Sequence, residues 1–273
     1  MDRIEIARYI IEKLDFKKEQ LKQAYKNTKN KIGFFYVDDL LPLDLAKEIF
    51  EVFPNKEEAV LRKSLKEFKY IAFQMDKYHA LLEEVIYAFQ EQTVVDKVAE
   101  ICGMQQVTPD HHIYAGGLSI MTENNFLKPH LDNSHDKERE KWRVLNLLFY
   151  VTPEWKKEYG GNLEIWPDGL GQDSIELFSK FNRLIVMVTH QESWHSVNKV
   201  IVNKQRCCVS NYYYSETPNS KEDRFHVTSF RGRPSEKLLD FVLNFDNKLR
   251  MSIRKIFKKG VKENAHHYKN KEL

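Results

Sequence analysis

Three side chains that could bind one metal ion, and one cation that could bind a carboxylate, occur in a set order along the chain. His130-Leu131-Asp132 comes first, His195 follows after a long gap, and Arg206 stands eleven residues later. In a strand, residues 130 and 132 would point to the same side, because side chains alternate. Two histidines and one carboxylate occupy one face of an iron(II) ion and leave three positions for a bidentate co-substrate and O2. Arg206 would then hold the far end of that co-substrate.

The His-x-Asp pattern alone is a weak signal, since a chain with 10 histidines and 40 acidic residues can match it by chance. The alternative interpretation of His130 is a hydrogen-bonded histidine on an edge strand, and that of Arg206 is a surface arginine. The elements around the motif favour the metal site. They are, in order, a Gly160-Gly161 turn before a strand, a Phe181-Asn182-Arg183-Leu184 strand, Trp194-His195, and a strand that carries Arg206, Ser210 and Tyr212.

Length and composition indicate one globular catalytic domain. A chain of 273 residues with 42% hydrophobic content can bury one substantial core. Its three cysteines, Cys102, Cys207 and Cys208, form neither a disulfide framework nor a C-x-x-C zinc pattern. No stretch approaches the ~20 apolar residues of a membrane span, and the first residues lack the apolar core of a secretory signal. We therefore expect a cytoplasmic protein that does not bind membranes.

Charge is distributed unevenly along the chain. Residues 1–31 carry nine basic and five acidic side chains, and residues 248–273 carry nine and two, whereas residues 32–247 carry 25 and 33. A basic tail can bind nucleic acid, but no basic stripe interleaved with aromatic residues runs through the body of the chain. We expect a small-molecule or peptidyl substrate rather than nucleic acid. A homodimer formed through the terminal helices is an open alternative to a monomer.

Hydrophobic periodicity separates a helical first part from a β-rich second part. Three- and four-residue spacing predicts helices over 4–27, 43–53, 57–68, 79–90, 92–102 and 234–258, with one early strand over 32–37. Short runs between turn residues predict strands near 112–121, 126–132, 143–151, 162–166, 174–178, 183–189, 194–202 and 206–214.

About eight short strands at this spacing predict an α+β protein with a double-stranded β-helix core, a cupin-like jelly roll. The predicted regions are a helical N-terminal support with one strand (1–107), the jelly-roll catalytic core (108–215), a C-terminal loop and helix (216–258) and a flexible basic tail (259–273).

The order of motifs resembles the Fe(II)/2-oxoglutarate-dependent dioxygenase superfamily, most closely its prolyl 4-hydroxylase-like branch. The resemblance is dense over about 118–215 and thinner over 32–53. It implies that His130, Asp132 and His195 bind Fe(II). It also implies that Arg206 binds the distal carboxylate of 2-oxoglutarate.

The resemblance extends to the residues around Arg206. It implies that the hydroxyls of Tyr150 and Ser210 assist Arg206, although these could otherwise be an ordinary core tyrosine and strand serine. One position departs from the family pattern. Met121 stands nine residues before the first histidine, where a tyrosine is frequent, so the aromatic role would pass to Tyr150 or Tyr114.

The sequence determines the substrate side least well. Tyr212 falls where the family has a substrate-side aromatic residue, and Trp194 adjoins the distal histidine. If Tyr212 is core packing, the pocket is expected around His112, Tyr114 and Asn146. The remaining histidines are expected to have structural roles, among them His135 in a charged loop and His266 and His267 in the tail.

The resemblance implies an oxidoreductase with Fe(II) as its metal, 2-oxoglutarate and O2 as co-substrates, and ascorbate as an optional reductant. Such an enzyme hydroxylates an unactivated C–H bond and releases succinate and CO2. The substrate stays open between a peptidyl prolyl-type side chain and a small polar metabolite such as a sugar or amino acid. A non-catalytic jelly roll that binds a metal or ligand is the alternative, but such a protein would not need the Arg206 clamp. Release of succinate distinguishes the two.

Overall fold

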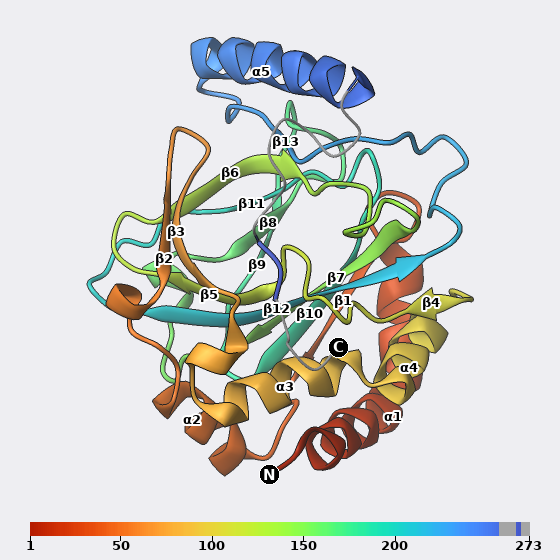
Figure 1. The fold of residues 1–273 in the computed structure, drawn as a ribbon, viewed down its shortest axis with the longest axis vertical. Coiled ribbons are helices and arrows are strands. Elements are labelled where there is room, and N and C mark those ends of the chain that lie inside the picture. Colours follow the sequence, from red (N-terminus) through yellow and green to blue (C-terminus); the bar gives the residue numbers. More distant parts are fainter. Residues whose placement is uncertain (257–265, 269–273) are drawn as a thin grey trace.

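A computed structural model describes residues 1–256 and 266–268, and its centre is one curled antiparallel sheet (Figure 1). The strands are β1 (Phe34–Asp38), β2 (Val60–Lys63), β3 (Glu67–Ala72), β4 (Val107–Thr108), β5 (Gly117–Met121), β6 (Phe126–Leu131), β7 (Trp142–Tyr150), β8 (Leu163–Ile165), β9 (Ile175–Leu177), β10 (Arg183–Val188), β11 (His195–Val197), β12 (Arg206–Ser215) and β13 (Ser229–Phe230). They follow one another across the sheet in the order β1-β10-β7-β12-β5-β3-β6-β11-β8-β9. The predicted α+β double-stranded β-helix is confirmed.

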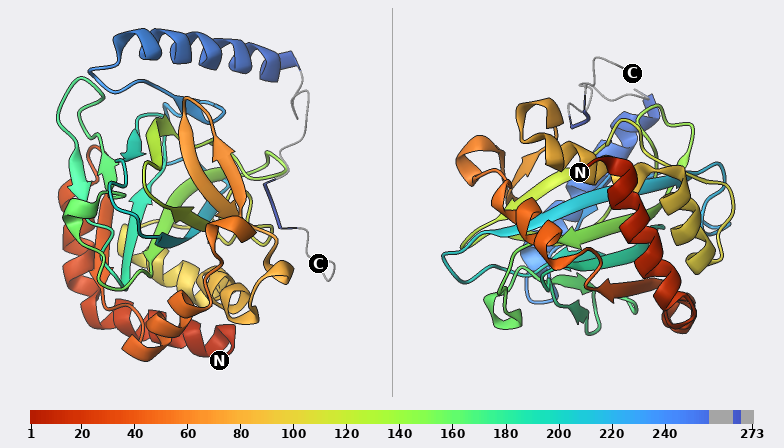
Figure 2. Two further views of the ribbon diagram at one scale, coloured as in Figure 1. Left: turned by 90° about the vertical axis from the view of Figure 1, so that its left-hand side faces the viewer. Right: turned by 90° about the horizontal axis from the view of Figure 1, so that it is seen from below.

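Helices α1 to α4 cover one side of this curled sheet, and α5 lies on the opposite side (Figures 1 and 2). They are α1 (Arg3–Thr28), α2 (Leu43–Glu51), α3 (Ala80–Gln90), α4 (Gln92–Cys102) and α5 (Lys237–Ile256), with short 3-10 helices η1 (Lys56–Glu58), η2 (Met75–Lys77) and η3 (Lys157–Tyr159). Helix α1 starts with a capping box between Asp2 and Glu5. Helix α4 ends where Gly103 adopts a left-handed conformation, φ +66°. The helices predicted over 4–27, 43–53, 79–90 and 92–102 are confirmed.

The helix predicted over 57–68 is wrong, because these residues form η1 and most of a β-hairpin. Strand β2 pairs with β3, and β3 lies between β5 and β6 in the sheet. The Lys, Glu and Leu residues of this segment favour helix locally, but strand pairing over a long sequence distance decides the outcome. Strands β1 and β3 therefore share one sheet with strands of the predicted catalytic core. The boundary proposed at residue 107 stays a prediction.

Two predicted strands are much shorter than expected. The segment predicted near 112–121 enters the sheet only at Gly117, because Ile113 and Ala115 adopt left-handed backbone conformations, φ +47° and +65°. These conformations turn the chain instead of extending it. The strand predicted near 194–202 is limited to His195–Val197, where its pairing with β6 becomes irregular.

Charged residues help to attach helix α5 to the sheet and the segments beside it. Asp240 pairs with Arg231 at 2.6 Å, and Asp246 pairs with Lys66 at 2.6 Å. The Leu243 side chain is buried, whereas four other apolar side chains of the helix are exposed, namely Leu238, Val242, Phe245 and Leu249. The last two residues of the helix predicted over 234–258 lie outside the described residues. The homodimer expected through the terminal helices stays a prediction.

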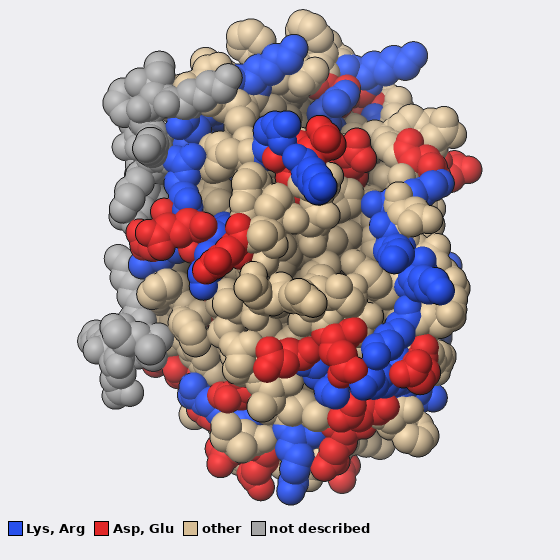
Figure 3. Space-filling view, turned by 90° about the vertical axis from the view of Figure 1, so that its right-hand side faces the viewer, with Lys and Arg blue, Asp and Glu red and all other residues tan. Residues whose placement is uncertain are grey.

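The surface seen in Figure 3 has Lys and Arg side chains interspersed with Asp and Glu around a central area of uncharged residues. Within residues 1–256 and 266–268, no helix has both the length and the apolar character needed to cross a membrane. Of the tail predicted over 259–273, the structure describes residues 266–268, and His267 and Tyr268 among them are buried. The flexible basic tail stays a prediction, since the rest of residues 259–273 lies outside the described residues.

Candidate active site

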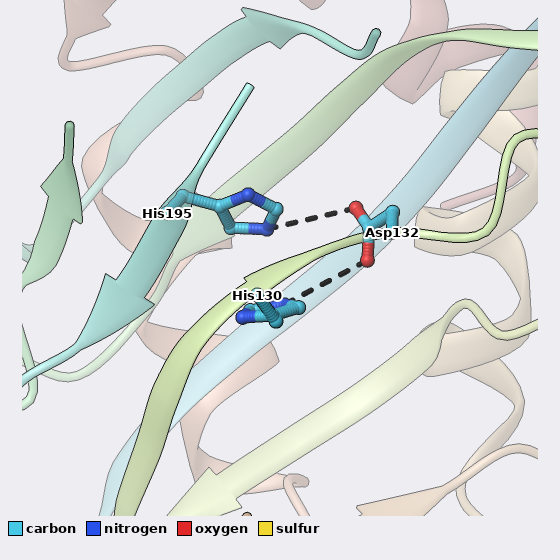
Figure 4. A group of neighbouring side chains, drawn as sticks. All are labelled: His130, Asp132 and His195. Carbon is cyan, nitrogen blue, oxygen red and sulfur yellow. Dashed lines mark ion pairs between the residues drawn. The ribbon is translucent and has the colours of Figure 1, made fainter. Parts of the chain in front are cut away.

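Two paired strands bring the predicted metal ligands together. His195 at the start of β11 lies opposite His130 in β6, and Asp132 directly follows β6. The imidazole ring centroids are 4.1 Å apart. The Nε2 atoms of His130 and His195 lie 3.7 Å and 3.6 Å from the two carboxylate oxygens of Asp132 (Figure 4). One ligand atom from each of the three residues falls within 4.8 Å of the others, which is the spacing that a single bound ion requires.

Hydrogen bonds orient both imidazoles for metal binding. Nδ1 of His130 lies 2.9 Å from the carbonyl oxygen of Lys128, and Nδ1 of His195 lies 2.9 Å from the carbonyl oxygen of Ser193. Because a carbonyl only accepts, each Nδ1 carries the proton and donates it. Each Nε2 is therefore left with a lone pair that faces Asp132. Backbone carbonyls fix the tautomer of metal-bound histidines in the same way.

Burial and neighbouring charges set the protonation of this group. Burial, together with the nearby His195, lowers the pKa of His130 to about 3, so His130 is neutral at physiological pH. Burial alone would raise the pKa of Asp132, but His195 and Arg143 oppose it and the net pKa is below the usual value. A neutral histidine and an ionised carboxylate are the forms that bind a divalent metal. The donor set therefore fits Fe(II).

Two residues support the Asp132 carboxylate from β7. Asn146 donates from Nδ2 to Oδ2 at 3.2 Å, and Nη1 of the buried Arg143 lies 3.9 Å from Oδ1. The Arg143 guanidinium also lies 3.8 Å from the centroid of the Tyr212 ring and donates to the Tyr214 hydroxyl at 3.2 Å. This buried cation balances the negative charge beside the metal position.

Arg143 was not among the predicted site residues. Strict alternation along β7 would place it on the face opposite Asn146. A bulge intervenes, however, since Leu145 pairs with Tyr213 and Arg143 pairs with Tyr214, which leaves residue 144 unpaired. The extra residue turns the Arg143 side chain toward Asp132. The only signal in the sequence is a charged residue at the start of an apolar strand.

One cavity contains the metal group and most of the other predicted site residues. Strand β12 turns every second side chain into it, from Arg206 through Cys208 and Ser210 to Tyr212. The predicted residues that line it are His130, Asp132, His195, Arg206, Tyr150, Ser210, Tyr212 and Asn146.

Arg206 supplies this cavity with a buried positive charge. Its side chain is 3% exposed, and its Nε hydrogen-bonds to nothing among the described residues. The Cζ atom lies 5.2 Å from the ring centroid of Tyr150. Burial raises the pKa of the Tyr150 phenol, so its hydroxyl remains protonated and can donate. A buried arginine that lines a cavity and has a donor without a hydrogen-bond partner among the described residues indicates an anion site.

Three predicted substrate-side residues do not line the cavity. Trp194 is half-buried, and its carbonyl accepts the backbone N–H of Trp166 at 2.9 Å. Tyr114 is buried, and its backbone carbonyl accepts a hydrogen bond from Nη2 of Arg143 at 3.3 Å. His112 is exposed.

The cavity also has lining residues that the sequence analysis missed. Lys69 and Ile71 come from β3, whose residues were predicted as helix or left unassigned, and His266 comes from the predicted tail. Met121, which stands where the family pattern frequently has a tyrosine, is buried and also lines the cavity. No periodic pattern in the sequence points to His266, because its position depends on contacts with distant segments.

Gly161 allows the backbone to pass close to Arg206. Its φ is +70°, and a Cβ atom there would lie 2.9 Å from Cδ of Arg206. Gly169 offers a matched control, since its φ is +81° and a Cβ atom would meet nothing within 4 Å. Both glycine-to-alanine variants should lose about 1–2 kcal/mol of stability through the left-handed backbone.

We expect only Gly161→Ala to weaken the binding of 2-oxoglutarate as well, because it displaces the guanidinium. Urea unfolding and 2-oxoglutarate titration of the iron-loaded variants measure the two effects separately. Equal 2-oxoglutarate affinity in the two variants would show that Arg206 tolerates the added methyl group.

Comparison with known proteins agrees with this geometry. Residues 116–214 match the 2OG-Fe(II) oxygenase superfamily, whereas no curated protein matches the chain. A prolyl-4-hydroxylase from Pseudomonas putida is 14% identical, with a TM-score of 0.53 over 71% of this chain and 98% of that one. A Phytophthora capsici prolyl 4-hydroxylase is 15% identical, with a TM-score of 0.55 over 93% and 80% of the two chains. At such identities the structural similarity concerns the fold.

Proposed function

We propose that this protein, whose residues 116–214 match the 2OG-Fe(II) oxygenase superfamily, hydroxylates an unactivated C–H bond, with 2-oxoglutarate and O2 consumed and succinate and CO2 released. The observation that carries the proposal is the set of residues that line one cavity. It combines the His130, Asp132 and His195 metal face with the buried, partly unpartnered Arg206. A metal-binding protein without turnover would have no use for a second, anion-binding group beside the metal.

The predicted metal and 2-oxoglutarate ligands in the cavity each have a part in this proposal. The triad would hold Fe(II), and Arg206 would bind the distal carboxylate of 2-oxoglutarate through its fork of donors. The Tyr150 hydroxyl would satisfy the remaining carboxylate lone pairs. The assistance expected from Ser210 stays a prediction, because Ser210 lies four residues farther along β12 than Arg206. When bound, the metal and 2-oxoglutarate supply the oxidising chemistry. The protein binds and orients the reactants and excludes water.

Apolar side chains complete the cavity wall. Leu148 from β7, Leu163 from β8 and Val197 from β11 line it, and Leu163 is fully buried. Such walls keep bulk water from the reacting groups. Polar lining residues such as Ser119 and Asn146 suit a substrate with hydrogen-bonding groups. We therefore propose a peptidyl prolyl-type side chain or a small polar metabolite such as a sugar or amino acid as the substrate.

Succinate release tests the reaction class directly. The purified protein, loaded with Fe(II) under anaerobic conditions, should develop a visible charge-transfer band on addition of 2-oxoglutarate. Admission of O2 should then release succinate, and a chelator added beforehand should abolish it. A parallel assay with ascorbate tests whether a reductant prolongs turnover. A protein that binds iron and 2-oxoglutarate but releases no succinate would be a binding protein.

Tyr212 is the residue we expect to influence the substrate most directly. It lines the cavity two residues beyond Ser210, and Arg143 lies over its ring. Tyr212→Ala should lower the ratio of hydroxylated product to succinate about tenfold or more, because misplacement of a substrate by about 1 Å can cost 10²-fold in rate. Decarboxylation of 2-oxoglutarate without product should change much less.

The measurement requires a substrate found by screening peptides, amino acids and sugar nucleotides against the iron-loaded protein. Tyr212→Phe serves as the control, because it keeps the ring beneath Arg143 and removes only the hydroxyl. An unchanged product-to-succinate ratio in Tyr212→Ala would assign Tyr212 to core packing. The substrate side would then have to be sought around Asn146.

A further inference from the structure

A short segment near the C-terminus, residues 266–268, runs beside the loop that leads into β5. The backbone N–H of Ala115 donates to the carbonyl of His266 at 2.9 Å, and the N–H of Tyr268 donates to the carbonyl of His112 at 2.9 Å. Two backbone hydrogen bonds of this kind align the segment with the loop. A part of the chain more than 50 residues beyond the superfamily match at 116–214 is thereby fixed beside the cavity.

Side chains from two other elements anchor the same segment. Tyr268 is 4% exposed, its hydroxyl donates to Oε1 of Glu83 at 3.1 Å, and its ring lies 6.4 Å from that of Tyr87 on α3. Gln74, just before η2, donates from Nε2 to the carbonyl of His267 at 2.7 Å. The segment is therefore packed and hydrogen-bonded like an integral part of the fold.

The anchored segment places the His266 ring in the cavity wall. Nε2 donates to the carbonyl of Gly116 at 2.8 Å, and the ring centroid lies 4.7 Å from that of Phe73. His266 lines the same cavity as the metal group. Burial lowers its pKa to about 3, so the ring is neutral at physiological pH.

Strand register places His266 away from the carboxylate clamp. Arg206 pairs with Met121 at one end of the β5–β12 ladder, and Ser210 pairs with Gly117 at the other. Four residues of strand separate these positions, which corresponds to about 13 Å. Because His266 is bonded to Gly116, it lies at the Ser210 end. If 2-oxoglutarate occupies the Arg206 end, the His266 end is left for the substrate.

We propose that His266 is a substrate-contacting residue, delivered by the C-terminal segment, that limits the size of the molecules able to reach the metal. This inference rests on the proposed function, since it requires a metal at the triad and 2-oxoglutarate at Arg206. It adds a specificity-determining residue that lies outside the matched superfamily region.

Ligand binding to a cobalt-loaded protein tests the proposal without turnover. Co(II) replaces Fe(II), 2-oxoglutarate is added, and the visible d–d absorption reports a further ligand on the metal. Pyridine and 4-phenylpyridine offer the same donor atom with different bulk. We expect His266→Ala to bind 4-phenylpyridine about tenfold or more tighter than the wild type does. Its affinity for pyridine should change less than about twofold. Differences in pocket size can discriminate between ligands by such factors.

Matched variants separate the effect of the cavity wall on ligand selectivity from general effects on the fold. Tyr268→Ala removes the anchor and should shift the selectivity in the same direction, whereas Tyr268→Phe and the exposed His111→Ala should not. His266→Phe keeps the ring bulk and should retain wild-type selectivity. Unchanged ratios of the two affinities in both His266→Ala and Tyr268→Ala would overturn the inference. Failure of the wild type to bind cobalt and 2-oxoglutarate would instead overturn the proposed function.

Discussion

Replacing Asp132 with alanine is expected to lower Fe(II) affinity by more than about tenfold, because changes to residues that only support metal ligands already cost 10–100-fold. Asp132 is the sole anion of the triad, and its two oxygens lie 3.7 Å and 3.6 Å from the imidazoles of His130 and His195. Its loss removes both a ligand and the charge that balances the metal. Succinate release should fall in parallel.

Two further variants define what Asp132 contributes. Asp132→Asn preserves the size of the side chain and removes its charge, so weak iron binding in this variant would show that charge is required. Asp173→Ala removes an exposed carboxylate and is the matched control. Iron content is measured after gel filtration of the loaded proteins. Wild-type iron content in Asp132→Ala would end the assignment of the metal site.

Replacing Arg206 with alanine should raise the 2-oxoglutarate concentration needed for half-saturation by about 30-fold or more. Loss of one partner of a buried, hydrogen-bonded charge pair costs about 2–5 kcal/mol, and 1.4 kcal/mol corresponds to tenfold. Arg206 is buried, and Nε has no hydrogen-bond partner among the described residues. Iron affinity should remain nearly unchanged, because Arg206 contacts only the far carboxylate in the proposed complex.

Arg206→Lys distinguishes a fork of donors from a simple positive charge. Lysine retains the charge but offers a single ammonium group, so we expect only partial recovery of 2-oxoglutarate affinity. The charge-transfer absorbance of the anaerobic iron complex measures this affinity in all three proteins. If the wild type and Arg206→Ala bind 2-oxoglutarate equally well, the carboxylate clamp must lie elsewhere, and Lys69 is the other cation on the cavity wall.

Local patterns in the sequence were sufficient for the centre of the site. His130 and Asp132 are two residues apart, and Arg206, Ser210 and Tyr212 are separated by even steps. Because side chains alternate along a strand, this spacing already places each set on one face. The fold class followed from the same periodicity, since short strands and regular helices each leave a repeating apolar pattern.

Tertiary structure decided the residues whose positions depend on pairing between distant segments. The 57–68 segment has helix-favouring residues, yet half of it becomes β2 and the start of β3, because β2 pairs with β3 and β3 pairs with β5 and β6. Arg143 reaches Asp132 only through a bulge in β7, which a period of two cannot reveal.

His266 shows the same limit most clearly. It enters the cavity because segments around residues 74, 83 and 112–116 hold residues 266–268 in place. The sequence by itself determined which residues could form the metal face and the carboxylate clamp, because those sets are encoded by short spacings within strands. Only the tertiary structure decided what surrounds them, because long-range hydrogen bonds and packing leave no periodic trace in the sequence.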